Sequence, residues 1–443
     1  MPAHSGRSTA RSTDRPAPAG GVDVYLFPAV VGGGLGDIEE VLAAGRHLDR
    51  AGFRLILYRA HGRPLPPSVA GPWEWPRIER RARIARRARS ALTVAPSWGV
   101  SAGPSRPGRF GRGGPWEVEA RDVEAAYGPE RTVHVSLEEF ARTLPSRAET
   151  RERLREGGVP AREIPSRLRA AEAAHEVAAF RAAFRTFRAF DRPNVLHLYA
   201  TFRPDRAFGR EFPEAVQTGP LSSGHFVPPE RRSSRPTRGR SREWVWYASP
   251  ASAERVASEV VAGLEGLRPP VHLYVRSPRP WATLSRTRRV VVDTRARSPR
   301  AWRARFRSAE LRIVTGSRTL IEAMEVGGPF LYFNGVLGAG ARRRPHRPEK
   351  IRAWLDLARR AGVSSSLRAD LADFARGRRV ADVVRRAASG RDGWRRFPTT
   401  LPPAGISASR GDAGQVVVAV ARELSRPGVR ASDLVARWRG SNP

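Results

Sequence analysis

The chain has 443 residues, 40% of them hydrophobic, which is enough to build two domains with cores of their own. It contains no cysteine, which excludes disulfides and thiolate metal sites. The formal net charge is +36, and Lys350 is the single lysine among 79 basic residues, so arginine carries this charge.

Residues 1–20, rich in arginine, serine and proline, are predicted to form a disordered tail. The sequence has no apolar run of membrane-spanning length and no secretory signal with an apolar core. We therefore expect a cytoplasmic protein, either free or peripheral at the inner face of the membrane.

A strand, a glycine-rich turn, a helix and a second strand follow in direct succession. The apolar run Val22–Phe27 predicts a buried strand, and Gly32–Gly34 with Gly36 form the turn after it. Apolar and small residues then recur on one helical face, at Ile38, Val41, Leu42, Gly45 and Leu48. Gly52 stands where a left-handed C-cap is expected, ahead of the strand Phe53–Tyr58. This βαβ unit predicts a parallel sheet covered on both faces.

The glycine turn predicts a ligand site. In a parallel sheet such a turn lies at the carboxyl edge, and the helix start offers N–H groups and the positive end of the helix dipole. Gly33, Gly34 and Gly36 are therefore candidates for a phosphate loop. A tight turn without any ligand can have the same glycine pattern.

The charge is most concentrated in Arg77–Arg89, "RIERRARIARRAR", which predicts a helix with arginine around most of its circumference. Such a helix would bind an anionic membrane surface or phosphates, or its arginines would simply face solvent. Because alanine, glycine and proline are also abundant, much of the arginine is equally explained by coding bias in a GC-rich genome.

The sequence patterns that indicate helices and strands are weaker between residues 73 and 242. The stretch 73–125 is predicted to be irregular, with helices at 147–157 and 165–190 and strands at Asn194–Phe202 and Ala215–Leu221. Proline and charged residues at 228–242 mark a linker.

The alternation of strands and helices restarts after the linker. Strands are predicted at Trp244–Ser249, Val271–Val275, Arg289–Asp293, Leu311–Thr315 and Pro329–Phe333, and helices at Ser252–Leu267, Pro299–Ser308, Ser317–Gly327, 350–361, 378–388, 414–424 and 431–438. The two halves predict an α/β fold of two Rossmann-like, doubly wound domains with mostly parallel sheets, facing across a cleft. We expect an N-terminal domain at 21–227 and a C-terminal domain at 243–443, whose last helices complete it or pack back on the N-terminal domain.

The stretch Leu311–Phe333 carries the most specific pattern. A strand runs into Gly316, a helix begins just after it, and Glu322 lies one turn beyond Thr319. Such a helix start can hold a diphosphate, and a carboxylate one turn later can accept hydrogen bonds from two ribose hydroxyls. An ordinary strand–turn–helix with a surface glutamate would have the same sequence.

This stretch resembles the C-terminal domain of GT-B glycosyltransferases, particularly the group that includes the N-acetylglucosaminyltransferase of lipid II synthesis. Their pattern G-x-x-T-x-x-E-A-x-x-x-G-x-P is matched by Gly316, Thr319, Glu322, Ala323, Gly327 and Pro329. The resemblance implies a GT-B architecture and a nucleotide-sugar donor, a UDP-sugar in the simplest case, with no other cofactor. It implies that Glu322 holds the ribose and that the diphosphate lies on Gly316, Ser317, Arg318 and Thr319.

Two further stretches of the sequence can be compared with glycosyltransferases of this kind. "GGGLGD", Gly32–Asp37, resembles the glycine loop of glycogen-synthase-like and heptosyltransferase enzymes, which faces the donor phosphates and the acceptor. The lipid II group often has a His-Gln pair near the donor sugar, where this chain has His346 followed by Arg347. Because the glutamine is missing, the identity of the sugar stays open.

The resemblance also bears on mechanism. Many retaining enzymes of this kind have a second glutamate eight positions before the ribose-binding one, where this chain has Val314. An inverting, metal-independent displacement by an acceptor hydroxyl is therefore favoured, with a lipid-linked or saccharide acceptor. The candidates for the general base are Asp37, His61 and His197. Asp37 could instead be a helix N-cap, and His197 a packed core histidine.

Two other classes of function remain open. A sugar-nucleotide epimerase shares the two-domain layout and would act without an acceptor. A non-catalytic nucleic-acid-binding protein is suggested by charge alone and would bind in a salt-dependent way, but it leaves Glu322 and its surroundings unexplained. We expect no specific nucleic-acid partner.

Overall fold

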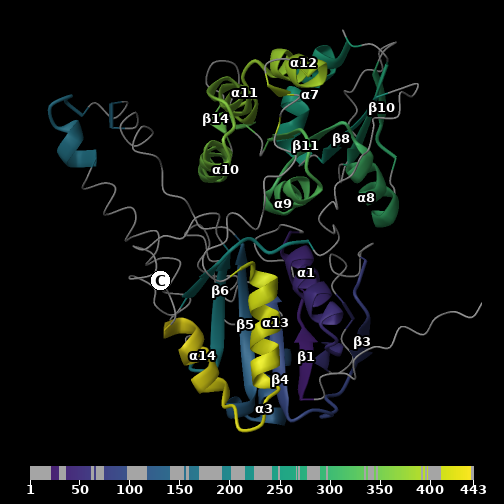
Figure 1. The fold of residues 1–443 in the computed structure, drawn as a ribbon, viewed down its shortest axis with the longest axis vertical. Coiled ribbons are helices and arrows are strands. Elements are labelled where there is room, and N and C mark those ends of the chain that lie inside the picture. Colours follow the sequence, from purple (N-terminus) through teal and green to yellow (C-terminus); the bar gives the residue numbers. More distant parts are fainter. Residues whose placement is uncertain are drawn as a thin grey trace, which may run out of the picture.

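Figure 1 shows the fold in a computed structural model. The structure describes residues 21–28, 36–60, 64–65, 74–96, 117–139, 154–155, 159–168, 192–200, 215–223, 242–247, 250–265, 267, 270–276, 290–295, 298–333, 336–337, 344–345, 348–390, 393–394, 397 and 411–440. Residues 228–241 of the predicted linker therefore lie outside the described residues. Most residues of the predicted helices at 147–157 and 165–190 lie outside them as well.

The first sheet has seven parallel strands in the order β3-β2-β1-β4-β5-β6-β7. These strands are β1 (Val22–Leu26), β2 (Leu55–Tyr58), β3 (Ile78–Arg81), β4 (Ser90–Pro96), β5 (Thr132–Glu139), β6 (Val195–Ala200) and β7 (Ala215–Thr218). Helix α1 (Gly36–Arg50) joins β1 to β2, and α3 (Glu117–Tyr127) with the short 3₁₀ helix η2 (Pro129–Arg131) precedes β5.

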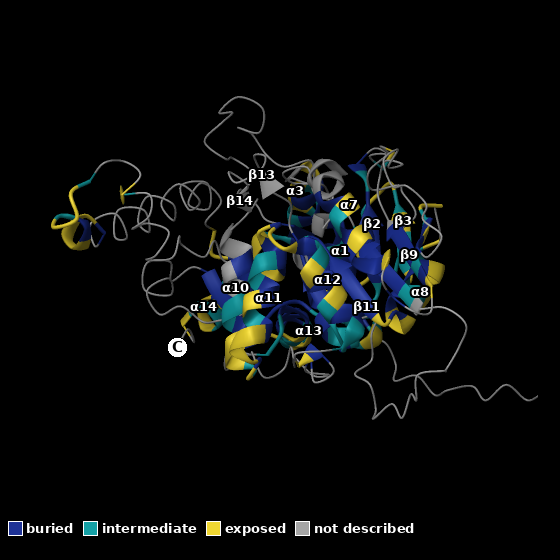
Figure 2. Ribbon diagram, turned by 90° about the horizontal axis from the view of Figure 1, so that it is seen from above, coloured by how far each residue is buried: buried dark blue, intermediate teal, exposed yellow. Residues whose placement is uncertain are grey.

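Alternate residues of β1 enter two different cores. Val24 and Leu26 pack with α1 on one face of the sheet, whereas Tyr25 and Phe27 pack with α3 on the other. Figure 2 shows the resulting burial of the strands beneath the helices. Two covered faces are expected for a parallel sheet, and they explain why Val22–Leu26 carries apolar residues on both faces.

The structure confirms the strand, helix and second strand of the predicted βαβ unit, whereas its glycine turn lies in 29–35, outside the described residues. The predicted inner face of α1 is buried, and Gly45 packs closely there, since a Cβ would lie 2.6 Å from Leu26 Cδ1 and that side chain would have to shift. Gly52 ends the unit's helix with a φ of 88°, in the left-handed region that favours glycine.

The second sheet has five parallel strands in the order β10-β9-β8-β11-β12. They are β8 (Arg242–Tyr247), β9 (Val271–Arg276), β10 (Val290–Asp293), β11 (Leu311–Val314) and β12 (Phe330–Tyr332). The helices that follow them are α7 (Pro250–Glu265), α8 (Pro299–Ser308), α9 (Ser317–Val326), α10 (Pro348–Arg360), α11 (Ser365–Ala375) and α12 (Val380–Ser389). A small antiparallel pair joins β13 (Val336–Leu337) to β14 (Arg344–Pro345).

Both strand orders belong to doubly wound α/β folds, so the predicted fold class of two Rossmann-like domains is confirmed. One core cluster runs from Trp244 to Phe397. Another combines the first sheet with the last two helices, α13 (Ala413–Leu424) and α14 (Ala431–Gly440). In Figure 1 these two helices, in yellow, lie against the first sheet.

The prediction that 73–125 is irregular was wrong for its described parts, 74–96 and 117–125, whereas 97–116 lies outside the described residues. This stretch contains the edge strand β3, the buried central strand β4 and the helix α3. Strand β4 reads "SALTVAP", in which Ser90 and Thr93 interrupt a short apolar run. Strand β5 and helix α11 were also missed.

The arginine helix predicted at Arg77–Arg89 was wrong as well. Part of the segment forms β3, which pairs with β2, and 82–89 is an irregular connection to β4. Tertiary contacts override helix propensity here, because the Asp23 carboxylate accepts the backbone N–H groups of Arg87 and Ala88 at 3.1 and 3.0 Å.

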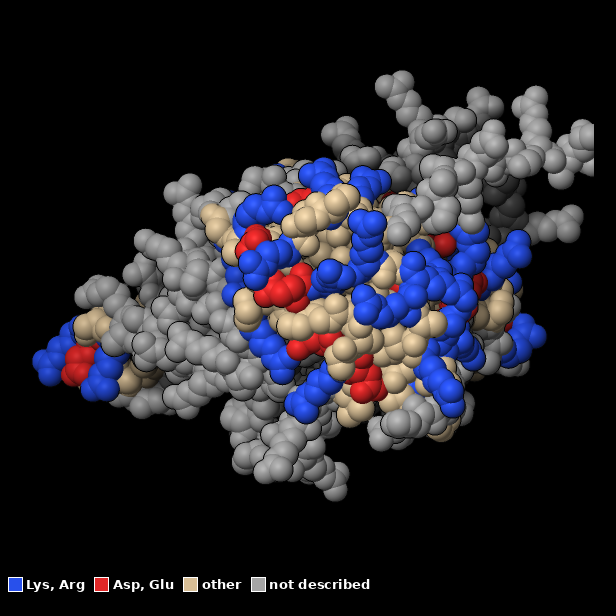
Figure 3. Space-filling view, turned by 90° about the horizontal axis from the view of Figure 1, so that it is seen from below, with Lys and Arg blue, Asp and Glu red and all other residues tan. Residues whose placement is uncertain are grey.

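The described surface is rich in arginine. In Figure 3 basic side chains cover much of the face seen from below, with acidic side chains between them. None of the helices in the described ranges is long and apolar enough to cross a bilayer. The anionic membrane partner stays a prediction.

Candidate functional site

Each sheet has a topological switch point, where the strand order reverses. It lies between β1 and β4 in the first sheet and between β8 and β11 in the second. From these points the chain leaves β1 toward α1 and leaves β11 toward α9. Ligands of doubly wound folds bind outside the carboxyl ends of such strands, so a site is expected where α1 and α9 begin.

Helix α9 begins with an open turn. Gly316 directly precedes it with a φ of 82°, which favours glycine. No side chain caps this helix start, and a Cβ at Gly316 would find no heavy atom within 4 Å. The Thr319 hydroxyl donates back to the Thr315 carbonyl and steadies the turn. The uncapped N–H groups and the positive dipole end suit an anion.

Three charged residues share one face of α9, because Arg318, Glu322 and Glu325 recur at i, i+4 and i+7. This face meets the first domain, since α9 contacts α1 and lies directly above it in Figure 1. The opposite face of α9 enters the core of the second domain through Leu320, Ile321 and Met324. Glu322 is therefore a junction residue and not an ordinary surface glutamate.

The Glu322 carboxylate has unused hydrogen-bonding capacity. It is half-buried, and among the described residues no donor bonds to it. Its pKa is raised to about 7, chiefly by burial and also by Glu39 and Glu325, while Arg318 and Arg46 act in the opposite direction. The site thus holds a carboxylate whose charged form is favoured only when donors approach it.

Further charges reach the junction from other elements. Arg303 of α8 pairs with Glu74, which follows β2, and burial lowers the pKa of Arg303. Burial also lowers the pKa of Arg46 in α1. Within the described ranges no group of three or more histidine and acidic side chains could hold a metal ion.

The structure places some of the predicted catalytic residues. Helix α1 begins at Gly36, so Asp37 lies inside its first turn and not at the N-cap. His197 lies within β6 and is 2% exposed, and burial lowers its pKa to about 3. A base that acts near neutral pH needs a pKa near that pH, so this position favours a core role for His197.

The remaining predicted site residues lie outside the described residues. They are Gly33, Gly34, His61, His346 and Arg347. For Ser317 the structure describes the backbone, as the first residue of α9.

A charged pair at the carboxyl edge of the first sheet was missed. Glu119, in the first turn of α3, is fully buried with a carboxylate oxygen 3.5 Å from Arg59 Nη1. Within the described part neither of its oxygens accepts a hydrogen bond. Its neighbours Tyr58 and Asp122 are joined by a hydrogen bond of 2.7 Å. The pair was missed because it depends on α3, which the sequence pattern did not reveal.

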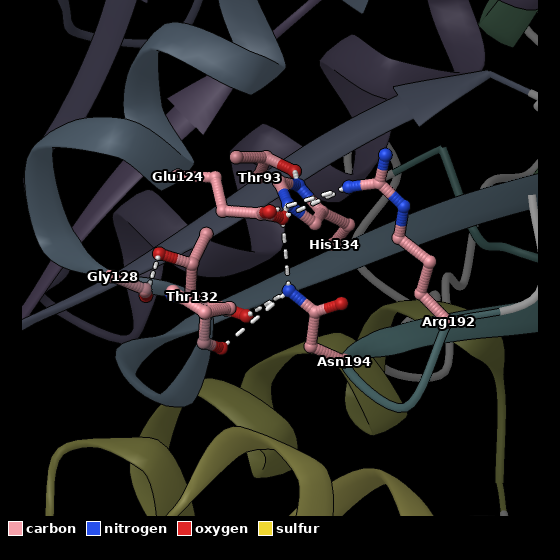
Figure 4. Close-up of polar contacts among 8 residues, drawn as sticks. Thr93, Glu124, Gly128, Thr132, His134, Arg192 and Asn194 are labelled. Atoms are coloured by element: carbon pink, nitrogen blue, oxygen red, sulfur yellow. Dashed lines mark hydrogen bonds and ion pairs between the residues drawn. The ribbon is translucent and has the colours of Figure 1, made fainter.

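A second polar cluster lies near the amino edge of the first sheet and is shown in Figure 4. The ring of His134 contacts Thr93 Oγ1 through Nδ1 at 2.7 Å and Glu124 Oε2 through Nε2 at 2.8 Å. Asn194 Nδ2 donates to the same carboxylate at 3.1 Å, and Arg192 Nη1 donates to its other oxygen at 3.2 Å.

This threonine–histidine–carboxylate arrangement resembles a hydrolytic triad but stands in the wrong place for one. Thr93 and His134 are 0% and 1% exposed, so no substrate reaches the hydroxyl. The cluster also lies away from the carboxyl ends of the strands, where ligands bind. It therefore satisfies polar groups in a buried sheet.

Glu124→Gln is expected to lower the free energy of unfolding by about 1.5–3 kcal/mol at pH 7, since hydrogen bonds to a charged group are lost. The His134 hydrogen bond lowers the Glu124 pKa to about 2. The stabilisation is therefore present above the ordinary glutamate pKa and is lost as pH falls through about 2. Urea unfolding at pH 7 and pH 2.5 measures it. Glu130→Gln, at an exposed pair with Arg430, is the control, and an equal loss there would contradict the buried role.

No protein-family model and no curated protein matches the chain. Solved structures of glycosyltransferases are similar to it over most of its length. MurG of Acinetobacter baumannii is 11% identical with a TM-score of 0.36, and the match covers 94% of this chain and 99% of that one.

Two plant enzymes are similar in the same way. A UDP-glucosyltransferase from Polygonum tinctorium is 11% identical with a TM-score of 0.41, covering 93% of this chain and 99% of that one. UGT2 of Phytolacca americana, solved with UDP-2fluoro-glucose and pterostilbene, is 12% identical with a TM-score of 0.44, covering 94% and 98%. Because all three TM-scores are below 0.5, they do not establish a shared activity.

Proposed function

We propose that the protein is a glycosyltransferase of GT-B architecture that moves a sugar from a nucleoside-diphosphate sugar to an acceptor hydroxyl. The observation that carries the proposal is the pairing of an uncapped helix start with the carboxylate of Glu322 one turn later. The first can hold the diphosphate, and the second can accept two hydrogen bonds from a ribose.

The proposed donor site assigns a role to each part of the turn. The backbone at Gly316, Ser317 and Thr319 receives the diphosphate, and the Arg318 charge lies nearby. Ribose hydroxyls give Glu322 the donors that it lacks and favour its charged form. A UDP-sugar is the simplest donor, with His346 and Arg347 proposed near the sugar.

The proposed reaction is an inverting displacement without a metal ion. The acceptor oxygen attacks the anomeric carbon, the bond from this carbon to the diphosphate oxygen breaks, and the acceptor proton passes to a base. Asp37 is the proposed base, because it follows the carboxyl end of β1 at the switch point. The helix start of α9 stabilises the nucleoside diphosphate that leaves. The acceptor class, lipid-linked or saccharide, is part of the same proposal.

A nucleotide screen tests the donor class. A nucleoside diphosphate at about one hundred times its Kd should stabilise the folded protein by about 2.7 kcal/mol, which melting curves detect. UDP, GDP and ADP with their sugars form the panel. A chain that no nucleotide stabilises would contradict the proposal.

A turnover assay then separates transferase from epimerase. Release of nucleoside diphosphate should require an added saccharide or lipid-linked acceptor. Conversion of the donor sugar without any acceptor would instead support the epimerase. EDTA should leave the rate unchanged.

A further inference from the structure

The segment Leu221–Ser223 lies between the two domains. It follows β7, and just before it Gly219 forms a parallel bridge with Asp412 at the start of α13. Leu221 and Ser223 are 2% and 0% exposed, although the segment belongs to no helix or strand. Its buried backbone groups therefore need partners from neighbouring elements.

The second domain supplies partners from α9. Arg318 Nη1 donates to the carbonyl oxygen of Leu221 at 2.7 Å. The Glu325 carboxylate accepts the backbone N–H of Ser223 at 2.5 Å and also the hydroxyl of Ser223. Two charged side chains of one helix face thus reach both ends of the segment.

The first domain supplies partners from α1. Arg46 Nε donates to the carbonyl oxygen of Ser223 at 2.7 Å, and Arg46 Nη2 donates to Glu39 at 2.9 Å. His47 Nε2 lies 2.7 Å from Ser222 Oγ. All three residues of the segment are therefore bonded, from α1 on one side and from α9 on the other.

Burial makes this set of bonds mutually dependent. Arg46 and Arg318 are 8% and 6% exposed, and Glu39 and Glu325 balance their charges. Removing one charge from a buried set leaves the others uncompensated. Three of the bonds end on backbone atoms of the segment, so a rotation of α9 against α1 would break several of them at once.

We propose that Arg46, Arg318 and Glu325 form a clasp on Leu221–Ser223 that fixes the orientation of the second domain relative to the first. Glu322 lies between Arg318 and Glu325 on the same face of α9, so the clasp also fixes where this carboxylate meets the first domain. The clasp residues act as positioning residues, and they hold the two domains whether or not a nucleotide is the ligand.

Spin labels can test the clasp, because the chain has no cysteine of its own. Ala125→Cys on α3 and Ala262→Cys on α7 place one label on an exposed helix position in each domain. Pulsed EPR should give one narrow distance distribution for the labelled protein. Glu325→Gln and Arg46→Gln should each broaden it or add a second distance, because the domain orientation is no longer fixed.

Controls make the result decisive. Asp382→Asn, which removes an exposed pair with Arg385 on α12, should leave the distribution unchanged. Ser223→Ala removes one clasp bond without removing a charge from the buried set, and it gives the same test if Glu325→Gln does not fold. A distribution unchanged by Ser223→Ala and by whichever charge variants fold would overturn the clasp. Broadening in a protein that binds no nucleotide would support the clasp while contradicting the proposed function.

Discussion

Replacing Asp37 by asparagine is expected to lower the rate of sugar transfer by about 10²–10⁴-fold, the usual contribution of a general base. Asp37 lies in the first turn of α1, at the switch point of the first sheet, and α1 contacts α9 of the second domain. In the proposed reaction its carboxylate takes the acceptor proton as the new glycosidic bond forms. Asparagine has nearly the same shape but cannot take that proton.

Stability separates this role from a structural one. An acidic residue in a first helical turn contributes about 0.3–1 kcal/mol through the helix dipole, so the Asn variant should melt almost like the parent. Asp37→Glu keeps the carboxylate and should retain part of the rate. Asp382→Asn removes an acidic residue from the first turn of α12 and should leave turnover unchanged. An Asn variant with parental turnover would redirect the search for the base to His61.

The sequence predicted those parts of the fold that depend on residues close together in the chain. Val22–Phe27 and Leu311–Thr315 are mostly apolar because both faces of a parallel strand are buried, and the glycine after Leu311–Thr315 marks a turn. Gly52 and Gly316 have left-handed φ values, which only glycine adopts easily. The boundaries of the strands and helices around both switch points were therefore predictable.

Strand β5 shows that the pattern within a strand does not always predict whether its side chains are buried. Its residues Thr132, His134 and Ser136 alternate with apolar ones, which is typical of a strand with one solvated face. All three are instead buried; α3 packs against β5, and its Glu124 gives His134 a hydrogen-bond partner. A helix that the sequence pattern did not reveal thus decides the environment of this strand.

The junction was unpredictable for a related reason. Glu325 and Ser223 are 102 residues apart, and no sequence pattern near either residue indicates that they contact each other. The motif around Gly316 predicted that Glu322 faces a ligand, but not that its helix neighbours hold the other domain. Single charged residues acquire such roles only when the two domains are brought together.

Replacing Glu322 by glutamine is expected to weaken nucleotide binding at least tenfold at pH 8. Hydrogen bonds to a charged group contribute about 1.5–3 kcal/mol, and glutamine keeps the shape while removing the charge. Calorimetric titration with the nucleotide found in the screen measures this. At pH 5.5 the parent carboxyl is itself largely protonated, since burial raises its pKa to about 7, so the two affinities should converge.

The same variant should be more stable than the parent at pH 8, by about 1–3 kcal/mol without nucleotide. A carboxyl whose folded pKa is raised stabilises the protein below its ordinary pKa, and this stabilisation is lost as pH rises through about 7. Glutamine stays neutral and avoids the loss, so urea unfolding should show a gain at pH 8 that disappears near pH 5. Glu310→Gln, an exposed position at the amino end of β11, should change neither stability nor affinity. If the Glu322 carboxylate binds nucleotide and also destabilises the folded protein, the glutamine variant should bind nucleotide more weakly and be more stable. A glutamate that served the fold alone would give a less stable variant and an unchanged affinity.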